Sequence, residues 1–171
     1  LFSDKKNPDV IYTSPGCGIV SGINRGHQRR LLSVSIDLDG EDQETFTSYS
    51  PSELAELSRE QLIANLVQSG LWTALRVRPF SKVPRPDSQP LALFINGMDT
   101  NPLAADPAVV LADRLEDFTR GVNALAKLPS QATYLCVDDA VRKLIASSKF
   151  AASVQIETFA GPHPAGLSGT H

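Results

Sequence analysis

Two loops rich in glycine, proline and short polar side chains are the first candidates for chemistry. One covers residues 96–102 and the other covers residues 160–166, and each follows an apolar run that predicts a strand. Ligands of open parallel sheets bind beyond the carboxyl ends of the strands, so we expect both loops beside a binding site. Their composition fits ordinary turns equally well. The candidate residues are Asp99, Thr100, Asn101, Gly161 and His163.

The segment 71–82 is a third candidate. It carries the only tryptophan of the chain, together with two arginines and a phenylalanine. An aromatic ring beside a guanidinium group suits a planar, partly polar ligand such as a flavin or a quinone headgroup. Alternatively, the segment only connects a helix to a strand, and its tryptophan fills the core. The candidate residues are Trp72, Leu75, Arg76, Arg78, Phe80, Ser81 and Lys82.

Familiar catalytic motifs are absent from the sequence. It contains no Walker loop, no Gly-x-Gly-x-x-Gly and no Ser-His-Asp spacing, so the catalytic residues are unknown. Two distant cysteines, Cys17 and Cys136, are too few for a disulfide framework or a zinc site, and we expect no metal. Cys136 lies in an apolar run that predicts a buried thiol, which fits a reducing, cytoplasmic setting.

Composition narrows the class of protein. The chain has 171 residues, of which 42% are hydrophobic and 20% charged, as in ordinary globular domains. A net charge of −3 argues against a nucleic-acid partner. No apolar stretch approaches the roughly 20 residues that a membrane-spanning helix needs. The sequence lacks an initiator methionine and begins within a predicted strand, so we expect a piece of a longer protein.

Residues 1–45 predict an all-β module. Apolar runs at 10–13, 18–21 and 32–38 are separated by turn signals such as Pro15-Gly16. The run 32–38 alternates strictly between apolar and polar residues, which predicts a strand with one face in solvent and the other buried. The acidic stretch 41–49 predicts a linker.

Residues 46–171 predict an α/β domain. Capping boxes at Ser50 and Ser58 begin two helices, and Gly70 ends the second. Apolar runs then alternate with helical spacing, which predicts a parallel sheet whose first strand is covered on both faces. The predicted strands are 91–95, 133–137 and 153–159, and the helices between them are 106–128 and 139–148.

Several segments closely resemble hallmark motifs of the A-subunit family of sodium-translocating NADH:quinone reductases. The similarity runs in order from one end of the chain to the other, and the motifs are long and specific. More distantly, the chain is similar to the flavin-binding subunit of respiratory complex I and to the C subunit of Rnf complexes. The motifs are 4–8, 23–26, 69–84, 98–105, 161–167 and 169–171.

The resemblance implies a fold and a set of cofactors. The expected fold is a Rossmann-like parallel sheet with flanking helices, truncated at its C-terminus and preceded by part of a biotinyl/lipoyl-like β module. In the flavin-binding relatives, Ser-Gly-Leu leads into a glycine-rich loop that approaches the flavin phosphate. This chain keeps Ser69-Gly70-Leu71 but continues with bulky residues up to Phe80. We therefore expect no FMN on it.

The resemblance also implies a function. The expected role is that of a peripheral subunit on the cytoplasmic side of the bacterial inner membrane, with ubiquinone as the substrate that it helps to bind. NADH, the flavins and an iron–sulfur centre are expected on partner subunits, some of them integral membrane proteins. One alternative is a structural docking subunit with a degenerate flavin pocket. Another is a lipoyl-like carrier that is modified on Lys5 or Lys6.

Overall fold

The computed structural model describes residues 1–169, which form two compact units. The first unit comprises Leu1–Ser48 and Ile63–Pro86, and the second comprises Tyr49–Leu62 and the described residues from Asp87 onward. The end of the last resembling motif, Thr170 and His171, lies outside the described residues. The predicted domain limits, 1–45 and 46–171, stay a prediction, because compact units and sequence domains need not coincide.

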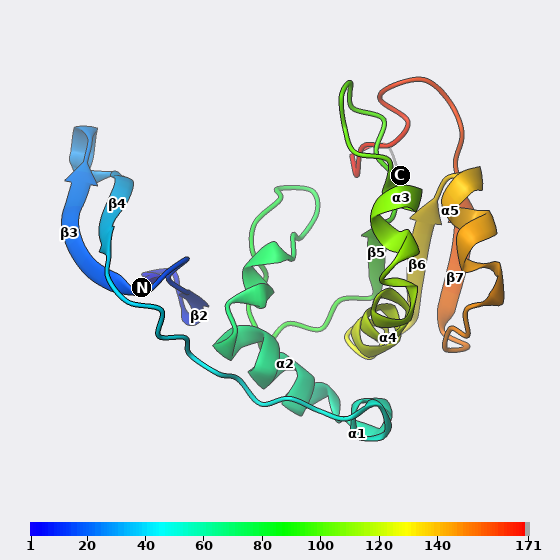
Figure 1. Cartoon of the computed structure of the whole chain (residues 1–171), viewed down its shortest axis with the longest axis horizontal. Coiled ribbons are helices and arrows are strands. Elements are labelled where there is room, and N and C mark those ends of the chain that lie inside the picture. The colour runs from blue at the N-terminus through cyan, green and yellow to red at the C-terminus, as the bar shows by residue number, and fades with distance from the viewer. Residues whose placement is uncertain (170–171) are drawn as a thin grey trace. The chain divides into compact units, whose positions relative to one another are not determined.

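The first unit contains two antiparallel hairpins (Figure 1). Strands β1 (Phe2–Asp4) and β2 (Asn7–Tyr12) form one, and the longer strands β3 (Gly18–Arg25) and β4 (Leu31–Leu38) form the other. A bulge at Ser21 shifts the register of the second hairpin. Within residues 1–169, neither hairpin is joined by a third strand. The residues from 39 to 49 form no helix or strand, as the predicted linker requires.

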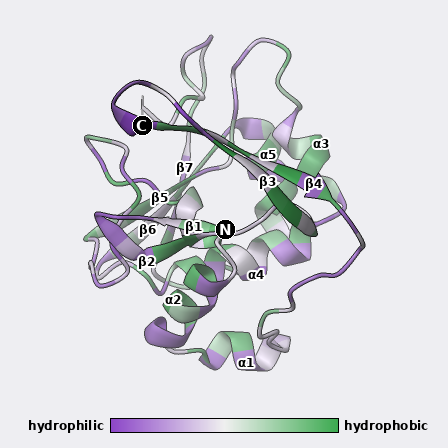
Figure 2. Cartoon of the chain, turned by 90° about the vertical axis from the view of Figure 1, so that its left-hand side faces the viewer, coloured by the Kyte–Doolittle hydropathy of each residue, from purple (hydrophilic) through white to green (hydrophobic). Residues whose placement is uncertain are grey.

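The prediction that β4 buries one face is wrong. Leu32 and Leu38 are 64% and 74% exposed, although Val34 and Ile36 between them are half-buried. Ile23 on the paired strand is also exposed, and the hydrophobic stretches of β3 are green in Figure 2. The alternation of the sequence is real, but a two-stranded ribbon provides no opposing layer on which to bury its apolar face.

Both predicted capping boxes are present. Helix α1 (Pro51–Glu56) begins at Ser50, whose side chain accepts from the Glu53 amide while the Glu53 carboxylate accepts from the Ser50 amide. Helix α2 (Arg59–Gln68) follows the reciprocal pair Ser58 and Gln61. Gly70 ends α2 with a φ of 76°, a conformation that glycine adopts without strain.

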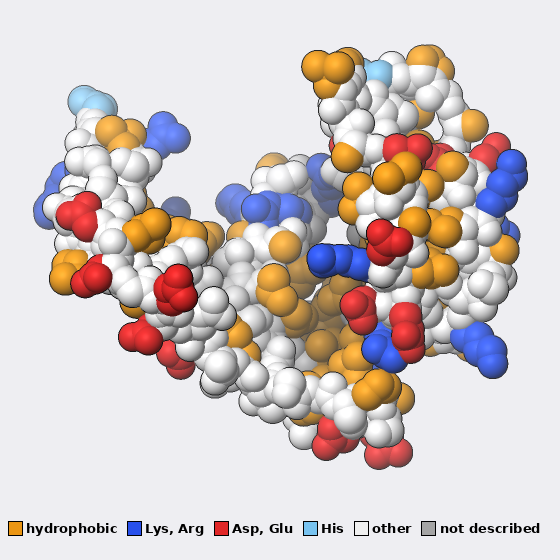
Figure 3. Space-filling model, in the orientation of Figure 1, with side chains coloured by type: hydrophobic (Ala, Val, Ile, Leu, Met, Phe, Trp, Pro, Cys, Tyr) orange, Lys and Arg blue, Asp and Glu red, His pale blue; other side chains and the backbone are white. Residues whose placement is uncertain are grey.

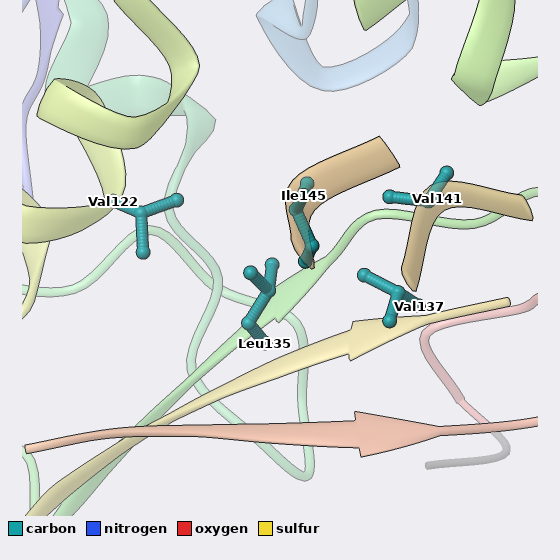
Figure 4. Packing of buried hydrophobic residues seen from close by; sticks show 5 residues of the cluster. All are labelled: Val122, Leu135, Val137, Val141 and Ile145. Atoms are coloured by element: carbon teal, nitrogen blue, oxygen red, sulfur yellow. The ribbon is translucent and has the colours of Figure 1, made fainter. Parts of the chain in front are cut away.

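The second unit is built on a parallel sheet with the strand order β5-β6-β7, as the sequence predicts. Its strands are β5 (Ala92–Asn96), β6 (Ala132–Val137) and β7 (Val154–Thr158). Helices α3 (Pro107–Ala112), α4 (Leu115–Leu125) and α5 (Asp139–Leu144) pack on one of its faces. Figure 4 shows the centre of this core, where Val122, Val141 and Ile145 face Leu135 and Val137 of β6.

The predicted single helix over 106–128 is broken into α3 and α4. It begins as expected, with Asp106 accepting from the Ala108 amide and Pro107 in the first turn. The backbone leaves helical geometry at Arg114, whose φ and ψ are −128° and 23°. Apolar positions on both sides of the break pack against the sheet, so the apolar spacing alone could not locate it.

The prediction that β5 is covered on both faces is also wrong. Phe94 is 60% exposed and stacks on Tyr134 of β6, with ring centroids 4.9 Å apart. The helices α3, α4 and α5 all pack on the opposite face, around Ile95 and Leu135. The unbroken apolar run of β5 therefore has one face in the core, and its other face carries the exposed aromatic pair instead of being buried.

Candidate functional site

The loop after β5 begins deep in the second unit. The Gly97 amide donates to the Cys136 carbonyl of the neighbouring strand at 2.7 Å, and both Gly97 and Met98 are buried. A Cβ at position 97 would lie 3.1 Å from Val137 and 3.3 Å from the Cys136 carbonyl oxygen. Gly97 therefore anchors the start of the loop to β6, and the polar residues of the loop come directly after this anchored position.

The two predicted sheet-end loops lie side by side. The Asn96 side-chain amide donates to the Gly166 carbonyl at 2.9 Å, and the Gly166 amide donates to Thr100 Oγ1 at 2.8 Å. The same Thr100 Oγ1 lies 3.4 Å from His163 Nδ1. The structure therefore brings together residues that are more than 60 positions apart, as expected for loops at one edge of a parallel sheet.

The remaining loop candidates shape the backbone. Asp99 Oδ1 accepts from both the amide and the side chain of Asn101, at 2.8 and 2.7 Å. Gly161 has a φ of 143°, which side-chain-bearing residues rarely adopt, and it turns the chain after β7. Asp99, Asn101, Gly161 and His163 are all exposed.

A shallow, open cavity of about 540 Å³ lies between these loops, α3 and Phe118 of α4. Its volume lies in the range of small-molecule sites, which is roughly 300–1,000 Å³. The polar lining comes from Asn96, Asp99, Asn101 and Ser168. The apolar lining comes from Ala105, Pro107, Val110, Leu111, Phe118 and Leu167.

The sequence did not reveal the apolar wall as part of a site. Val110, Leu111 and Phe118 have the spacing of core positions, and Leu111 and Phe118 do pack against the core as well as lining the cavity. The only signal was indirect: Asp106 and Pro107 begin a helix directly after the loop 96–102. That adjacency places α3 beside the loop.

Cys136 is buried beneath the first loop. Burial raises the pKa of its thiol, and the Glu157 carboxylate adds to the rise. A thiol held protonated is a poor nucleophile, which agrees with the predicted structural role. Cys17 is a free thiol as well, so the two cysteines form no disulfide.

The third candidate segment belongs to the first unit, whereas the candidate loop residues belong to the second. Trp72 is only 3% exposed, and its indole Nε1 donates to the Pro84 carbonyl at 2.9 Å. It stands in a short 3-10 helix, Leu71–Ala74, directly after Gly70. Its burial favours the alternative in which the tryptophan fills the core.

The exposed part of this segment is a tight turn. The Val77 amide donates to the Lys82 carbonyl at 2.8 Å and closes a loop that contains a cis Arg78–Pro79 peptide bond. Phe80 at the tip is 79% exposed, and Lys82 Nζ lies 5.8 Å from the centroid of its ring. Arg78 donates to Ser81 Oγ at 3.2 Å. Within the segment 71–82, the aromatic ring that is exposed to a ligand is therefore that of Phe80.

Leu75 and Arg76 immediately precede this turn. The Arg76 guanidinium donates to the carbonyls of Leu75, at 2.8 Å, and of Thr73. Leu75 is half-buried.

Among residues 1–169, no group of three or more His, Cys, Asp and Glu side chains is placed to hold a metal ion. No helix in the described part of the chain is long and apolar enough to cross a membrane.

Two family models match the chain. Residues 57–171 match the model described as the NqrA second alpha/beta domain. Residues 1–39 match the model described as the NqrA N-terminal barrel-sandwich hybrid domain. The mixed α/β unit with its parallel sheet agrees with the first of these descriptions.

Similar proteins cover the whole chain. All 171 residues align at 50% identity with the A subunit of the Na(+)-translocating NADH-quinone reductase of Neisseria meningitidis serogroup B. The protein of that name from Pseudomonas aeruginosa strain UCBPP-PA14 is 53% identical over 171 residues, and that from Haemophilus influenzae strain PittEE is 52% identical over 172. The chain spans 37–38% of the length of these relatives.

Proposed function

We propose, from the premise that this chain belongs to the NqrA family, that the complete protein is the A subunit of a sodium-translocating NADH:quinone reductase. Its contribution is contact with quinone rather than the binding of flavin or NADH. It is a peripheral subunit on the cytoplasmic side of the bacterial inner membrane. Its partners are the subunits that carry NADH, flavins and the iron–sulfur centre, including integral membrane subunits.

The observation that carries the quinone assignment is the cavity at the carboxyl end of β5. A quinone headgroup is a flat ring with two carbonyl oxygens, so it needs apolar walls and a few hydrogen-bond donors. Phe118, Val110 and Leu167 supply such walls. The side-chain nitrogens of Asn96 and Asn101 each donate one hydrogen bond within the loops, and an amide nitrogen has two hydrogens to donate.

The energetics favour a largely apolar ligand. Each neutral hydrogen bond to a quinone oxygen would contribute about 1 kcal/mol. Burial of the ring contributes about 25 cal/mol for each Å² of apolar surface removed from water, and therefore supplies most of the affinity. The Asp99 carboxylate at the rim disfavours a phosphate, because two anions would repel each other there.

The segment 72–82 stays a candidate quinone-binding segment of the first unit in its own right. Phe80 and Lys82 provide the ring face and the cation, while Trp72 is buried and Leu75 is half-buried. The bulky side chains of this segment leave no glycine-lined approach for a flavin phosphate, which supports a role without FMN. We infer further that the second unit has a Rossmann-like fold.

Photolabelling tests the proposal. The complete subunit would be irradiated with an azido-quinone, digested and analysed by mass spectrometry. We expect labelled peptides from the loops 96–102 or 160–168, or from α3, and competition by unlabelled quinone but not by FMN. Labelling that competition does not reduce would instead support the structural docking subunit with a degenerate flavin pocket.

One structural feature bears on the alternative function as a lipoyl-like carrier. Lys5 and Lys6 form the two-residue turn between β1 and β2, and the Lys6 amide donates to Asp4 Oδ1 at 2.9 Å. A modifiable lysine at a hairpin tip is what a lipoyl-like carrier requires. The intact mass of the protein from its native host distinguishes the two functions, because a carrier would show an added prosthetic group on one of these lysines.

A further inference from the structure

We propose that the turn 77–82 of the first unit docks on an anionic lipid surface, with Phe80 entering the headgroup layer. The turn is closed by the Val77–Lys82 pairing, which fixes Phe80 at its tip. Phe80 is 79% exposed, and Val77 at the base of the turn and Leu71 in the preceding 3-10 helix are exposed too. A large aromatic side chain at the tip of a closed turn is placed for contact with a partner, not with its own core.

In the sequence around Phe80, every charged residue from 70 to 86 is basic, and the first acidic residue after them is Asp87. Residues 70–86 include Arg76, Arg78, Lys82 and Arg85 and no aspartate or glutamate, although the chain as a whole has a net charge of −3. Figure 3 shows Lys and Arg side chains gathered over the loop that follows α2. This local excess of positive charge is complementary to a negatively charged surface.

The contacts of Arg76 and Lys82 do not neutralise their positive charges. The Arg76 guanidinium donates to backbone carbonyls, which carry no formal charge. Lys82 Nζ lies over the ring of Phe80, so cation and aromatic ring form one continuous exposed surface. Long basic side chains around an aromatic residue suit the boundary between lipid headgroups and acyl chains.

A lipid surface fits this combination better than a nucleic acid does. Single-stranded nucleic acids need several aromatic platforms along a basic groove, and the turn offers only one ring. Each Lys or Arg close to an anionic membrane increases partitioning about fivefold. Attraction of this kind is weakened by salt, because the screening length falls to about 8 Å at physiological ionic strength.

The test combines the complete subunit with vesicles that contain no quinone, so its result is separate from that of the quinone cavity. Phe80→Trp introduces an exposed reporter in addition to the buried Trp72, and subtracting the emission of the natural subunit with the same vesicles isolates its signal. We expect its emission to shift to shorter wavelength with vesicles of phosphatidylcholine and phosphatidylglycerol, but not with phosphatidylcholine alone. Salt should reverse the shift.

Sedimentation with the same vesicles measures the individual contributions. Arg76→Gln combined with Lys82→Gln should reduce partitioning on the order of 25-fold, and Phe80→Ser should reduce it several-fold. The matched control is Arg29→Gln with Arg30→Gln, which removes two charges from another exposed turn of the same unit and should change partitioning less than about twofold. A circular dichroism spectrum unchanged from that of the natural subunit verifies that each variant is folded.

Three outcomes would overturn the proposal. The first is an absence of binding to anionic vesicles, and the second is an equal loss in the control and in the Arg76 and Lys82 variant. The third is a shift of the Phe80→Trp emission on adding lipid-free partner subunits but not on adding vesicles, which would make the turn a protein contact.

Discussion

Gly166 lies so close to Thr100 that an ideal Cβ on the glycine would stand 2.5 Å from the threonine amide nitrogen. The two residues are joined in addition by the bond from the Gly166 amide to Thr100 Oγ1. Only a residue without a side chain allows the two sheet-end loops to approach in this way. The wall of the cavity therefore depends on one glycine.

Gly166→Ala should separate the two loops. Placing a methyl group against backbone atoms costs about 1–3 kcal/mol in packed sites, and here the loops can move apart to relieve it. We expect faster hydrogen exchange in both loops and weaker binding of quinone. Gly169→Ala is the matched control, because a Cβ there meets no atom within 4 Å. Equal effects of the two substitutions would contradict the close approach.

Thr133→Val should stabilise the second unit. Thr133 is fully buried in the sheet, and its Oγ1 has no hydrogen-bond partner. Replacing an unsatisfied hydroxyl by a methyl group of similar size should raise the local free energy of unfolding by about 1 kcal/mol. Hydrogen exchange of the β6 amides measures this change. Thr133→Ser keeps the hydroxyl and loses the methyl, so it should be destabilising, and a stabilised Ser variant would refute the explanation.

Lys127 at the end of α4 holds the carboxyl end of α1. Its Nζ donates to the carbonyls of Leu54, Ala55 and Leu57 at 2.8–3.0 Å. Lys127→Met removes these charged donors while keeping the length of the side chain, and it should destabilise α1 by about 2 kcal/mol. Hydrogen exchange of the α1 amides is the measurement. Lys143→Met, on an exposed position of α5, should have no effect on α1.

The apolar face of the β3–β4 hairpin should cause the 171-residue chain to self-associate. Ile23 and Leu32 are exposed on this face, and exposed apolar strands favour association. Ile23→Thr with Leu32→Gln should shift the chain toward monomer in sedimentation velocity. Ile19→Thr is the control, since Ile19 pairs with Asp37 on the opposite face. A chain that is monomeric without substitution would exclude this interface.

Local signals in the sequence were sufficient for most elements of the second unit. Ser50 and Asp106 predicted helix starts because capping depends on residues only two or three positions away. The three parallel strands followed from apolar runs separated by helical spacing. The break at Arg114 and the exposure of Phe94 were missed, because both depend on how the elements pack rather than on spacing.

The site was predictable only in part. The rule for parallel sheets placed Thr100 and His163 near each other, and they are. Composition could not decide whether Trp72 presents its ring or fills the core, since only its neighbours in space determine that. The apolar wall at Val110 has the same spacing as a core position, so nothing in the sequence marked it as part of a cavity.

Quinone binding to a pair of α3 variants tests the central claim most directly. Val110 lines the cavity and is 58% exposed, whereas Val109 beside it is 72% exposed and is not part of the lining. Isothermal titration of a short-chain ubiquinone into the complete subunit should show Val110→Trp binding at least about tenfold more weakly than the natural protein, a loss of roughly 1.4 kcal/mol. Val109→Trp should bind like the natural protein. Equal affinity in both variants would contradict the assignment of the quinone to this cavity.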